Sequence, residues 1–443
     1  MSTQHFTKPA KHTGKTVYKN ARLMDPATNL DAIGSVLVED GKIADLGEGL
    51  FMDGSIPDGA EVVDCGGHLL TPGLIDIQVH FREPGQEYKE TIETGSKSAA
   101  AGGVTSVSTM PNTDPVIDDV AVLEFLLKQG RETGYCKLHP YACVSKGMKG
   151  ERLTEMGLLA KAGAVAFTDD GLPIMNAQLM RQALTYAREL DVPIGQHAED
   201  LNLSNGGCMN EGPVATKLGL RGIPNASEAV IVDRDIQLVR LTGAKYHVLH
   251  ISTAEAIEAV RRAKHEGLPV TAEAAPHHFM LTDEACVDYR SFAKMNPPLR
   301  AERDKQAVIA GLQDGTIDAI ATDHAPHDQE SKRVPISEAA FGIVGLETML
   351  PLSLDLYHRG AMSLMDVIGK MTYQAADILK LPAGRLAKGT AADFALIDVD
   401  VEWVINPKEF SSKSKNSPFD DTKTKGRAIK TILNGSQVYK LTD

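Results

Sequence analysis

The feature that most constrains the fold is a regular alternation of short apolar runs with helix-like segments through the middle of the chain. Each run is short enough to be one buried strand, and the intervening segments have the length and apolar spacing of helices. The runs number eight: GLIDIQVH, GVTSVSTM, LHPYACV, GAVAFT, VPIGQH, YHVLHI, LPVTAEA and IDAIAT. Eight strands alternating with helices predict an α/β fold, a TIM-like (β/α)8 barrel, over residues 72–382.

Polar side chains stand at the C-terminal ends of these runs. In a barrel such ends converge on one mouth, where active sites lie, whereas an open doubly wound sheet would spread them along an edge. Their recurrence at strand after strand favours the barrel. The residues with the most useful chemistry are His80, Asn112, Asp170, His197, His250 and Asp323.

Both ends of the chain have a different texture, in which short β-like runs alternate with turns. Residues 1–71 contain VYKNARLMD and GSVLVEDGKIADLG, and residues 383–443 contain DFALIDVDVEWVI and GRAIKTILNGSQVYKL. We expect the two ends to complete one small β-sandwich. Within the C-terminal part, Ser411 to Gly426 is polar enough to predict a mobile loop.

Charge and hydropathy argue against several classes of function. A formal net charge of −13 argues against a nucleic-acid or anionic-membrane partner, since both require a basic face. No run approaches the roughly 18 consecutive apolar residues of a membrane span, and the polar N-terminus lacks the features of a secretory signal. We therefore expect a cytoplasmic protein that acts on a small molecule.

Imidazoles and carboxylates gathered at one mouth suit a divalent ion such as zinc. A single histidine at the end of a buried strand is more often a hydrogen-bonded core residue, but five suitable residues at five strand ends favour a metal site. His277 and His278 are adjacent, so in an extended strand at most one would face the mouth, and neither is assigned to metal. The candidate ligands are His80, Asp170, His197, His250 and Asp323.

Nine motifs in this order resemble type I dihydroorotases of the amidohydrolase superfamily: PGLIDIQVHFREPG, MPNTDP, AFTDDG, GQHAED, HVLHIST, EAAPHH, KMNPPLR, ATDHAPH and FGIVGLET. The resemblance implies reversible interconversion of N-carbamoyl-L-aspartate and L-dihydroorotate in pyrimidine biosynthesis, with bound zinc. It also suggests a homodimer and, as a further partner, aspartate transcarbamoylase.

The resemblance also assigns roles to the ligands. Asp170 would bridge two metal positions, although the motif alone leaves Asp169 open as the bridge. His197 and His250 would complete one position, and His80, residue 78 and Asp323 the other. Asp323 would act as general base and then as general acid.

Four further residues match substrate-binding positions of the same family. Arg82 would offer a charged fork to the substrate carboxylate, and Asn112 and Asn296 would offer neutral donors. His327 resembles a histidine on a mobile loop that reaches into the site, and the polar segment QESKRVPIS beyond it is suited to motion. The alternatives are a salt bridge at Arg82 and a solvated loop histidine at 327.

Gln78 departs from the pattern, because a histidine is expected two residues before His80. Residues two apart on a strand face the same side, and an amide oxygen binds zinc less well than imidazole does. We expect an active enzyme with one tight Zn²⁺ and a second position weakened by Gln78. The alternatives are a degenerate structural partner of aspartate transcarbamoylase, or a hydrolase of another cyclic amide or ureide.

Overall fold

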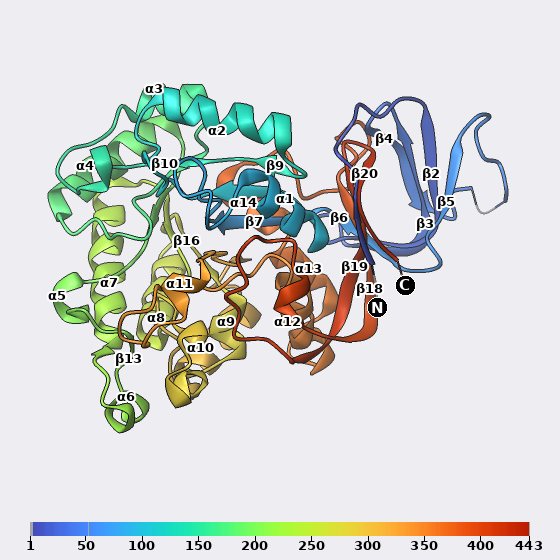
Figure 1. Cartoon of the computed structure of the whole chain (residues 1–443). Coiled ribbons are helices and arrows are strands. Elements are labelled where there is room, and N and C mark those ends of the chain that lie inside the picture. Colours follow the sequence, from blue (N-terminus) through green and yellow to red (C-terminus); the bar gives the residue numbers. More distant parts are fainter. Residues whose placement is uncertain (1–2, 52, 443) are drawn as a thin grey trace.

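A closed ring of parallel strands and a mixed sheet built from both chain ends organise the computed structural model, which describes residues 3–51 and 53–442 (Figure 1). The ring strands pair in the order in which they occur in the chain. They are β7 (Leu74–Val79), β8 (Val104–Thr109), β9 (Lys137–Leu138), β10 (Tyr141–Ala142), β11 (Ala166–Phe167), β12 (Ile194–Gln196), β15 (Tyr246–Val248), β16 (Val270–Ala274) and β17 (Ala319–Ile320).

These strands correspond to the eight apolar runs, and together they close a barrel. β9 and β10 come from a single run and are separated only by His139 and Pro140. A parallel bridge between Val79 and His324 joins the last strand to the first. The predicted (β/α)8 barrel is therefore confirmed.

Helices follow the strands and cover the outside of the ring. Their starts are set by side-chain caps, as at Thr91, Asp119, Asn176 and Thr253, whose oxygens accept from backbone N–H groups of the first turn. The main ones are α1 (Ile92–Ala101), α2 (Val120–Thr133), α3 (Met156–Ala162), α4 (Ala177–Leu190), α7 (Asn225–Thr242), α8 (Ala254–His265), α10 (Glu302–Asp314), α12 (Met349–His358), α13 (Leu364–Lys370) and α14 (Tyr373–Leu379).

Shorter elements lie in the connections. They are α5 (Leu201–Ser204), α6 (Pro213–Leu218), α9 (Pro276–Met280), α11 (Gln329–Lys332) and the strand pair β13 (Met209–Asn210) and β14 (Gly222–Ile223). Among the helices that the structure describes, none is long and apolar enough to cross a membrane.

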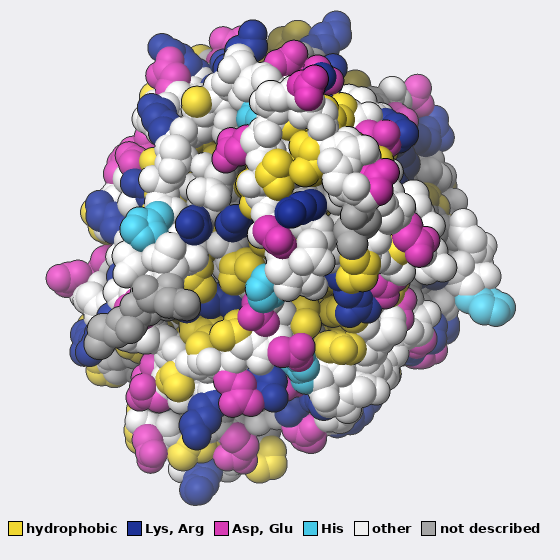
Figure 2. Space-filling model, turned by 90° about the vertical axis from the view of Figure 1, so that its right-hand side faces the viewer, with side chains coloured by type: hydrophobic (Ala, Val, Ile, Leu, Met, Phe, Trp, Pro, Cys, Tyr) yellow, Lys and Arg dark blue, Asp and Glu magenta, His cyan; other side chains and the backbone are white. Residues whose placement is uncertain are grey.

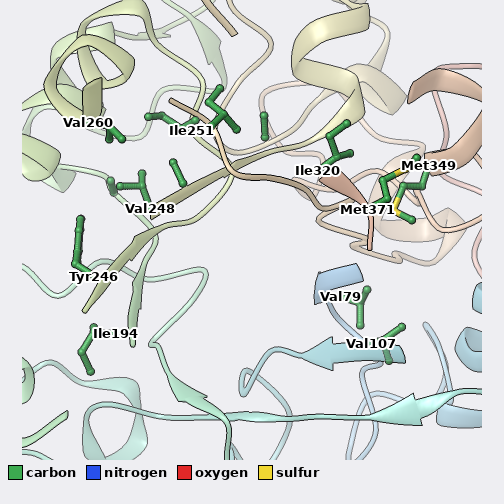
Figure 3. Close-up of a cluster of buried hydrophobic side chains, with 14 of the residues drawn as sticks. Val79, Val107, Ile194, Tyr246, Val248, Ile251, Val260, Ile320, Met349 and Met371 are labelled. Atoms are coloured by element: carbon green, nitrogen blue, oxygen red, sulfur yellow. The ribbon is translucent and has the colours of Figure 1, made fainter. Parts of the chain in front are cut away.

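The barrel core lies between the strands and the helices that cover them (Figure 3). Strand residues such as Val79, Val107, Ile194, Val248 and Ile320 are fully buried. Burying an aliphatic side chain of this kind contributes roughly 1.5–3 kcal/mol. This packing gives the strand ends, and the side chains that follow them, a rigid base.

The two chain ends form one mixed sheet beside the barrel, and its strands make up the predicted β-sandwich (Figure 1). β6 pairs with β18 in antiparallel fashion, so that the N-terminal and C-terminal parts are joined. Tyr18 and Phe394 meet edge to face in its core, with ring centroids 4.8 Å apart. The strands are β1 (Thr3–Phe6), β2 (Lys15–Asp25), β3 (Leu30–Glu39), β4 (Lys42–Glu48), β5 (Glu61–Asp64), β6 (Leu69–Pro72), β18 (Phe394–Val404), β19 (Lys423–Leu433) and β20 (Ser436–Thr442).

Candidate active site

A cavity of about 220 Å³ lies where the C-terminal ends of the barrel strands meet. All nine residues that the sequence predicts for the site line this cavity. They are His80, Arg82, Asn112, Asp170, His197, His250, Asn296, Asp323 and His327. The barrel therefore brings together side chains that are as much as 247 positions apart in the chain, from residue 80 to residue 327.

The first group of candidate metal ligands gathers around Asp170. His197 Nδ1 lies 3.4 Å and His250 Nε2 3.2 Å from the same oxygen, Asp170 Oδ1. The two imidazole nitrogens are themselves only 3.0 Å apart. Three buried donor atoms that converge on one point make a geometry that a divalent ion satisfies.

The second group shares Asp170 and adds two residues from the first and last strands. His80 Nε2 lies 3.4 Å from Asp170 Oδ2 and 3.1 Å from Asp323 Oδ1. All three side chains are buried, and their ligand atoms lie within 4.8 Å of one another. Asp170 therefore contributes one oxygen to each group, which is the arrangement of a bridging carboxylate. Asp169 instead accepts from the backbone N–H of Ser145 at 3.0 Å and is not in either group.

Gln78, on β7, lies next to Asp170, the residue that the two groups share. Its Nε2 lies 3.4 Å from Asp170 Oδ1, and its Oε1 is buried with no hydrogen-bond partner among residues 3–51 and 53–442. The side chain is fully buried, so the amide is enclosed beside the bridging carboxylate. An unpaired buried amide oxygen is costly, and a nearby cation would satisfy it.

Hydrogen bonds orient the imidazoles from behind. His197 Nε2 meets Glu199 Oε2 at 3.1 Å, and His80 Nδ1 meets Asn112 Oδ1 at 2.8 Å. With a metal bound, each contact would keep a proton on the outer nitrogen and present the inner nitrogen to the metal. Asn296 Nδ2 donates to the same Glu199 oxygen at 2.9 Å, so Glu199 links a candidate ligand to a candidate substrate-binding residue.

The charges of the site are strongly coupled. Burial by itself would raise the pKa of Asp170, but hydrogen bonds from His197 and His250 lower that pKa well below its usual range. Burial opposes a charge on His197, yet its hydrogen bonds to Asp170 and Glu199 raise its pKa to about 10. Asp170 therefore stays ionised and available to a cation.

Arg82 lies at the edge of the cavity and is almost completely buried. Its Nε donates to the carbonyl of Pro326 at 3.3 Å, and its guanidinium contacts His327 Nε2 at 3.4 Å. Burial lowers the pKa of Arg82 to about 10, which leaves it charged at neutral pH. It forms no salt bridge with Glu83, whose carboxylate accepts from the N–H of Ile92 at 2.8 Å instead. A charged guanidinium in a polar cavity can bind a carboxylate.

His327 is half-buried and lines the cavity beside Arg82, which is the place expected for a histidine that contacts the substrate. Burial, with help from the Arg82 charge, lowers the pKa of His327 to about 2, and the ring is neutral at physiological pH. The segment beyond it contains α11, whose Lys332 is fully buried and donates to the carbonyls of Ala340 at 2.8 Å and Gly342 at 3.1 Å. That segment is therefore fixed in this structure.

Three site residues adopt left-handed backbone conformations, with φ of +55° at Arg82, +35° at His250 and +49° at Asp323. Non-glycine residues are uncommon in this region and tend to cluster at functional sites, where the surrounding structure holds them. The backbone here directs the side chains into the cavity.

Several contributors were not found in the sequence. Glu199 holds the candidate ligand His197, which lies two residues away, whereas Glu90 and Asn416 act on His324 and His327, which are distant in the chain. The expected strand at His277 and His278 is wrong, because both belong to helix α9 and both are buried. Only the contribution of Glu199 had a signal in the sequence, because this acidic residue lies two residues after His197 in GQHAED.

The expected mobile loop between residues 411 and 426 is also contradicted in its first half. Ser412, Ser414, Asn416 and Ser417 are buried. The side chains of the first three bind the barrel, as when Ser414 Oγ donates to the Lys89 carbonyl at 2.7 Å. Polarity here reflects internal hydrogen bonding.

Comparison with known proteins adds independent evidence. Residues 67–256 match the family model described as dihydro-orotase-like. The chain is 54% identical over 426 residues to the dihydroorotase of Wolbachia sp. subsp. Drosophila simulans, covering 96% of each chain. It is 52% identical to the dihydroorotase of Ehrlichia chaffeensis, covering 97% of this chain and 96% of that one. It is 48% identical to that of Pelobacter propionicus, covering 95% and 99%.

Solved structures with the same architecture come from related hydrolases. The L-hydantoinase of Arthrobacter aurescens superposes with a TM-score of 0.86 at 25% identity, over 96% of this chain and 95% of that one. The dihydropyrimidinase of Brevibacillus agri gives a TM-score of 0.84 at 20% identity, with the same coverage, and this likeness concerns the fold alone.

Proposed function

This chain belongs to the dihydroorotase family, and from that premise we propose that it interconverts L-dihydroorotate and N-carbamoyl-L-aspartate at the Asp170 cavity, in the cytoplasm and as a step of pyrimidine biosynthesis. One structural observation supports the proposal independently of the sequence similarity to dihydroorotases. A carboxylate shared by two groups of buried ligands lines the same cavity as a buried, charged arginine. The ligand groups suit hydrolysis of a ring amide. The buried arginine suits a substrate with a carboxylate.

The residues fit a divalent metal, and we take this to be Zn²⁺ because the ligands are imidazole and carboxylate. Asp170, His197 and His250 would hold the tighter ion, while His80 and Asp323 would hold the weaker one with Asp170. When bound, such an ion activates water and polarises the scissile carbonyl. The proposed weakness of the second position follows from Gln78, whose neutral amide replaces a stronger imidazole donor.

Asp323 is placed to move the proton in both directions. Its Oδ1 lies 3.1 Å from His80 Nε2 at the end of the last barrel strand. In ring opening, its carboxylate would accept the proton of the attacking water and deliver it to the departing ring nitrogen. In ring closure, the proton would travel the opposite way.

Arg82, His327 and the two asparagines would hold the substrate. Asn112 binds His80 through Oδ1, which leaves its Nδ2 free as a donor. Asn296 binds Glu199 through Nδ2, which leaves its Oδ1 as an acceptor for a ring N–H. The asparagines would therefore offer one donor and one acceptor, rather than the two donors expected from the sequence.

A comparison of two substrates tests the proposal. Dihydroorotate carries a ring carboxylate, and 5,6-dihydrouracil is the same ring without it. We expect a strong preference for dihydroorotate. Arg82→Met should lower kcat/KM for dihydroorotate by roughly 10- to 100-fold, the usual worth of a charge-assisted hydrogen bond, and leave dihydrouracil unaffected. Preference for dihydrouracil in the native protein would instead support a hydrolase of another cyclic amide.

The presence of Gln78 where the family pattern has a histidine also supports a second candidate function, that of a non-catalytic partner of aspartate transcarbamoylase. Against it, His80, Asp170, His197, His250 and Asp323 remain in ligand geometry. Co-purification with the transcarbamoylase, without turnover in any metal state, would favour this alternative. A catalytic chain could also bind that partner, and we propose a homodimer as its basic assembly.

A further inference from the structure

Residues 411–417, here called the strap, leave the β-sandwich between β18 and β19 and run over the barrel (Figure 1). The strap is attached at successive points. The backbone N–H of Ser411 donates to Glu347, and that of Lys413 donates to Glu90 Oε1 at 2.9 Å. Ser414 Oγ donates to the Lys89 carbonyl at 2.7 Å. The strap therefore packs on the barrel, although in the sequence it lies between two strands of the β-sandwich.

Asn416 makes the contacts nearest to the cavity, and its side chain is 1% exposed. Its Oδ1 accepts from the backbone N–H of His327 at 3.1 Å. Its Nδ2 donates to the carbonyls of Ala325 at 2.9 Å and Gly342 at 3.0 Å. One amide thus binds three backbone groups on the two ends of the segment that carries His327.

The His327 ring has two close neighbours, Gly342 and Arg82. A β-carbon at Gly342 would lie 2.5 Å from the Ala325 carbonyl oxygen and 2.6 Å from His327 Cδ2, so the ring packs directly on the glycine backbone. The Nε2 atom of the ring also contacts the Arg82 guanidinium at 3.4 Å. Arg82 also depends on this segment through the Pro326 carbonyl.

We propose that Asn416 is a positioning residue for substrate binding: it holds the Ala325–Gly342 segment so that His327 and Arg82 present their polar groups to the substrate carboxylate. This inference rests on the proposed function for the identity of the substrate. It gives the strap, and with it the β-sandwich, a direct part in forming the active site. Asn416 acts only through other residues, because it does not line the cavity.

The test compares Asn416→Ala with Ser414→Ala as a matched control. Ser414 is buried in the same strap, but its side chain binds the Lys89 carbonyl instead of the His327 segment. Asn416→Ala should raise KM for dihydroorotate by about 10-fold, since small displacements of binding groups carry large penalties. We expect kcat, metal content and KM for dihydrouracil to stay near those of the control. Equal KM values for the two variants would overturn the proposal.

A double-mutant cycle with His327→Ala separates positioning from general destabilisation. If Asn416 acts through the His327 segment, the effect of Asn416→Ala on KM should shrink to less than about 3-fold once His327 is removed. Fully additive effects would overturn the proposal. If Asn416→Ala does not fold, Asn416→Ser replaces it in the same cycle, with the same expectations.

Amide hydrogen exchange provides a readout that does not depend on activity. The N–H of His327 is bonded to Asn416 Oδ1, so the peptide covering residues 325–342 should exchange at least about 10-fold faster in Asn416→Ala than in Ser414→Ala. Unchanged exchange would overturn the positioning role. Absence of dihydroorotate turnover in the native protein would overturn the proposed function alone, and the exchange result would still decide whether Asn416 positions the segment.

Discussion

At position 78 an amide side chain lies 3.4 Å from the shared carboxylate of Asp170, where the family pattern places an imidazole. The surrounding candidate ligands keep the close spacing that a metal site requires. His80 still lies within 3.4 Å of both Asp170 and Asp323, and all three are buried. Both ligand groups therefore keep their geometry with Gln78 in place, and we propose that its amide weakens only one of the two metal positions.

Gln78→His should restore a strong nitrogen donor to that position. We expect the second divalent ion to bind at least about 10-fold more tightly than in the native protein, because imidazole is the better zinc ligand. Calorimetric titration of the metal-free proteins, checked against metal content by mass spectrometry, measures this. Two equally tight ions in the native protein would sink the idea that Gln78 weakens one position.

Asp323→Asn removes the group proposed to carry the proton but keeps its size. Turnover of dihydroorotate should fall by roughly 10²- to 10⁴-fold, the usual contribution of general acid–base catalysis. The ion at Asp170, His197 and His250 should remain, since Asp323 belongs to the other group. Kinetics together with metal analysis checks both statements, and a variant that retained a tenth or more of native activity would refute the role.

At the scale of elements, the barrel strands could be predicted because parallel strands buried on both faces read as continuous apolar runs. The polar residues that follow these strands could also be predicted to lie together, because the C-terminal ends of barrel strands meet at one mouth. By contrast, β13 and β14 are each two residues long and, unlike the equally short β11 and β17, do not lie within a longer apolar run. Helix α9 was missed because Pro276–Met280 is a single turn.

The connection that carries His327 offers a prediction at this scale. Gly342→Ala would place a β-carbon 2.6 Å from His327 Cδ2, so the ring or the segment must shift. We expect KM for dihydroorotate to rise by about 10-fold or more, because binding groups are sensitive to displacements of about 1 Å. Gly47→Ala is the control, since a β-carbon there meets nothing within 4 Å. The idea fails if the two variants have the same KM.

At the scale of the whole molecule, the β-sandwich and the barrel depend on each other through buried polar contacts. Glu347 accepts from Ser98 Oγ of α1 at 3.0 Å and from Gln4 Nε2 of β1 at 3.3 Å, as well as from the strap. Sequence patterns could predict that the two ends form one sheet. They could not predict the strap, because the partners of Ser411 and Asn416 are fixed only when the whole chain has folded.

Glu347 also makes stability depend on pH. Burial raises its pKa from 4.5 to about 7, so the folded state holds a proton that the unfolded state has lost between these values. The contribution of Glu347 to stability should therefore fall as pH rises from about 4.5 to 7, by on the order of 3 kcal/mol. Glu347→Gln, which stays neutral, should show a shallower loss in denaturant unfolding at pH 5 and pH 7.5. Identical losses would contradict the assignment.

Basic and acidic side chains are interspersed on the face shown in Figure 2, so the charge of that face does not indicate a function. The chemistry lies in the cavity, where the Arg82 charge and the Asp170 ligand groups are buried. The net charge of −13 therefore does not prevent an anionic substrate from binding, since local cations decide.

The most direct measurement is the rate of dihydroorotate ring opening by the purified protein as isolated, after chelation and after zinc is restored. We expect turnover that disappears on chelation and returns with zinc, which would mean that the ligands around Asp170 suffice despite Gln78. Absence of turnover in all three states, or turnover that chelation leaves unchanged, would contradict a metal-dependent dihydroorotase.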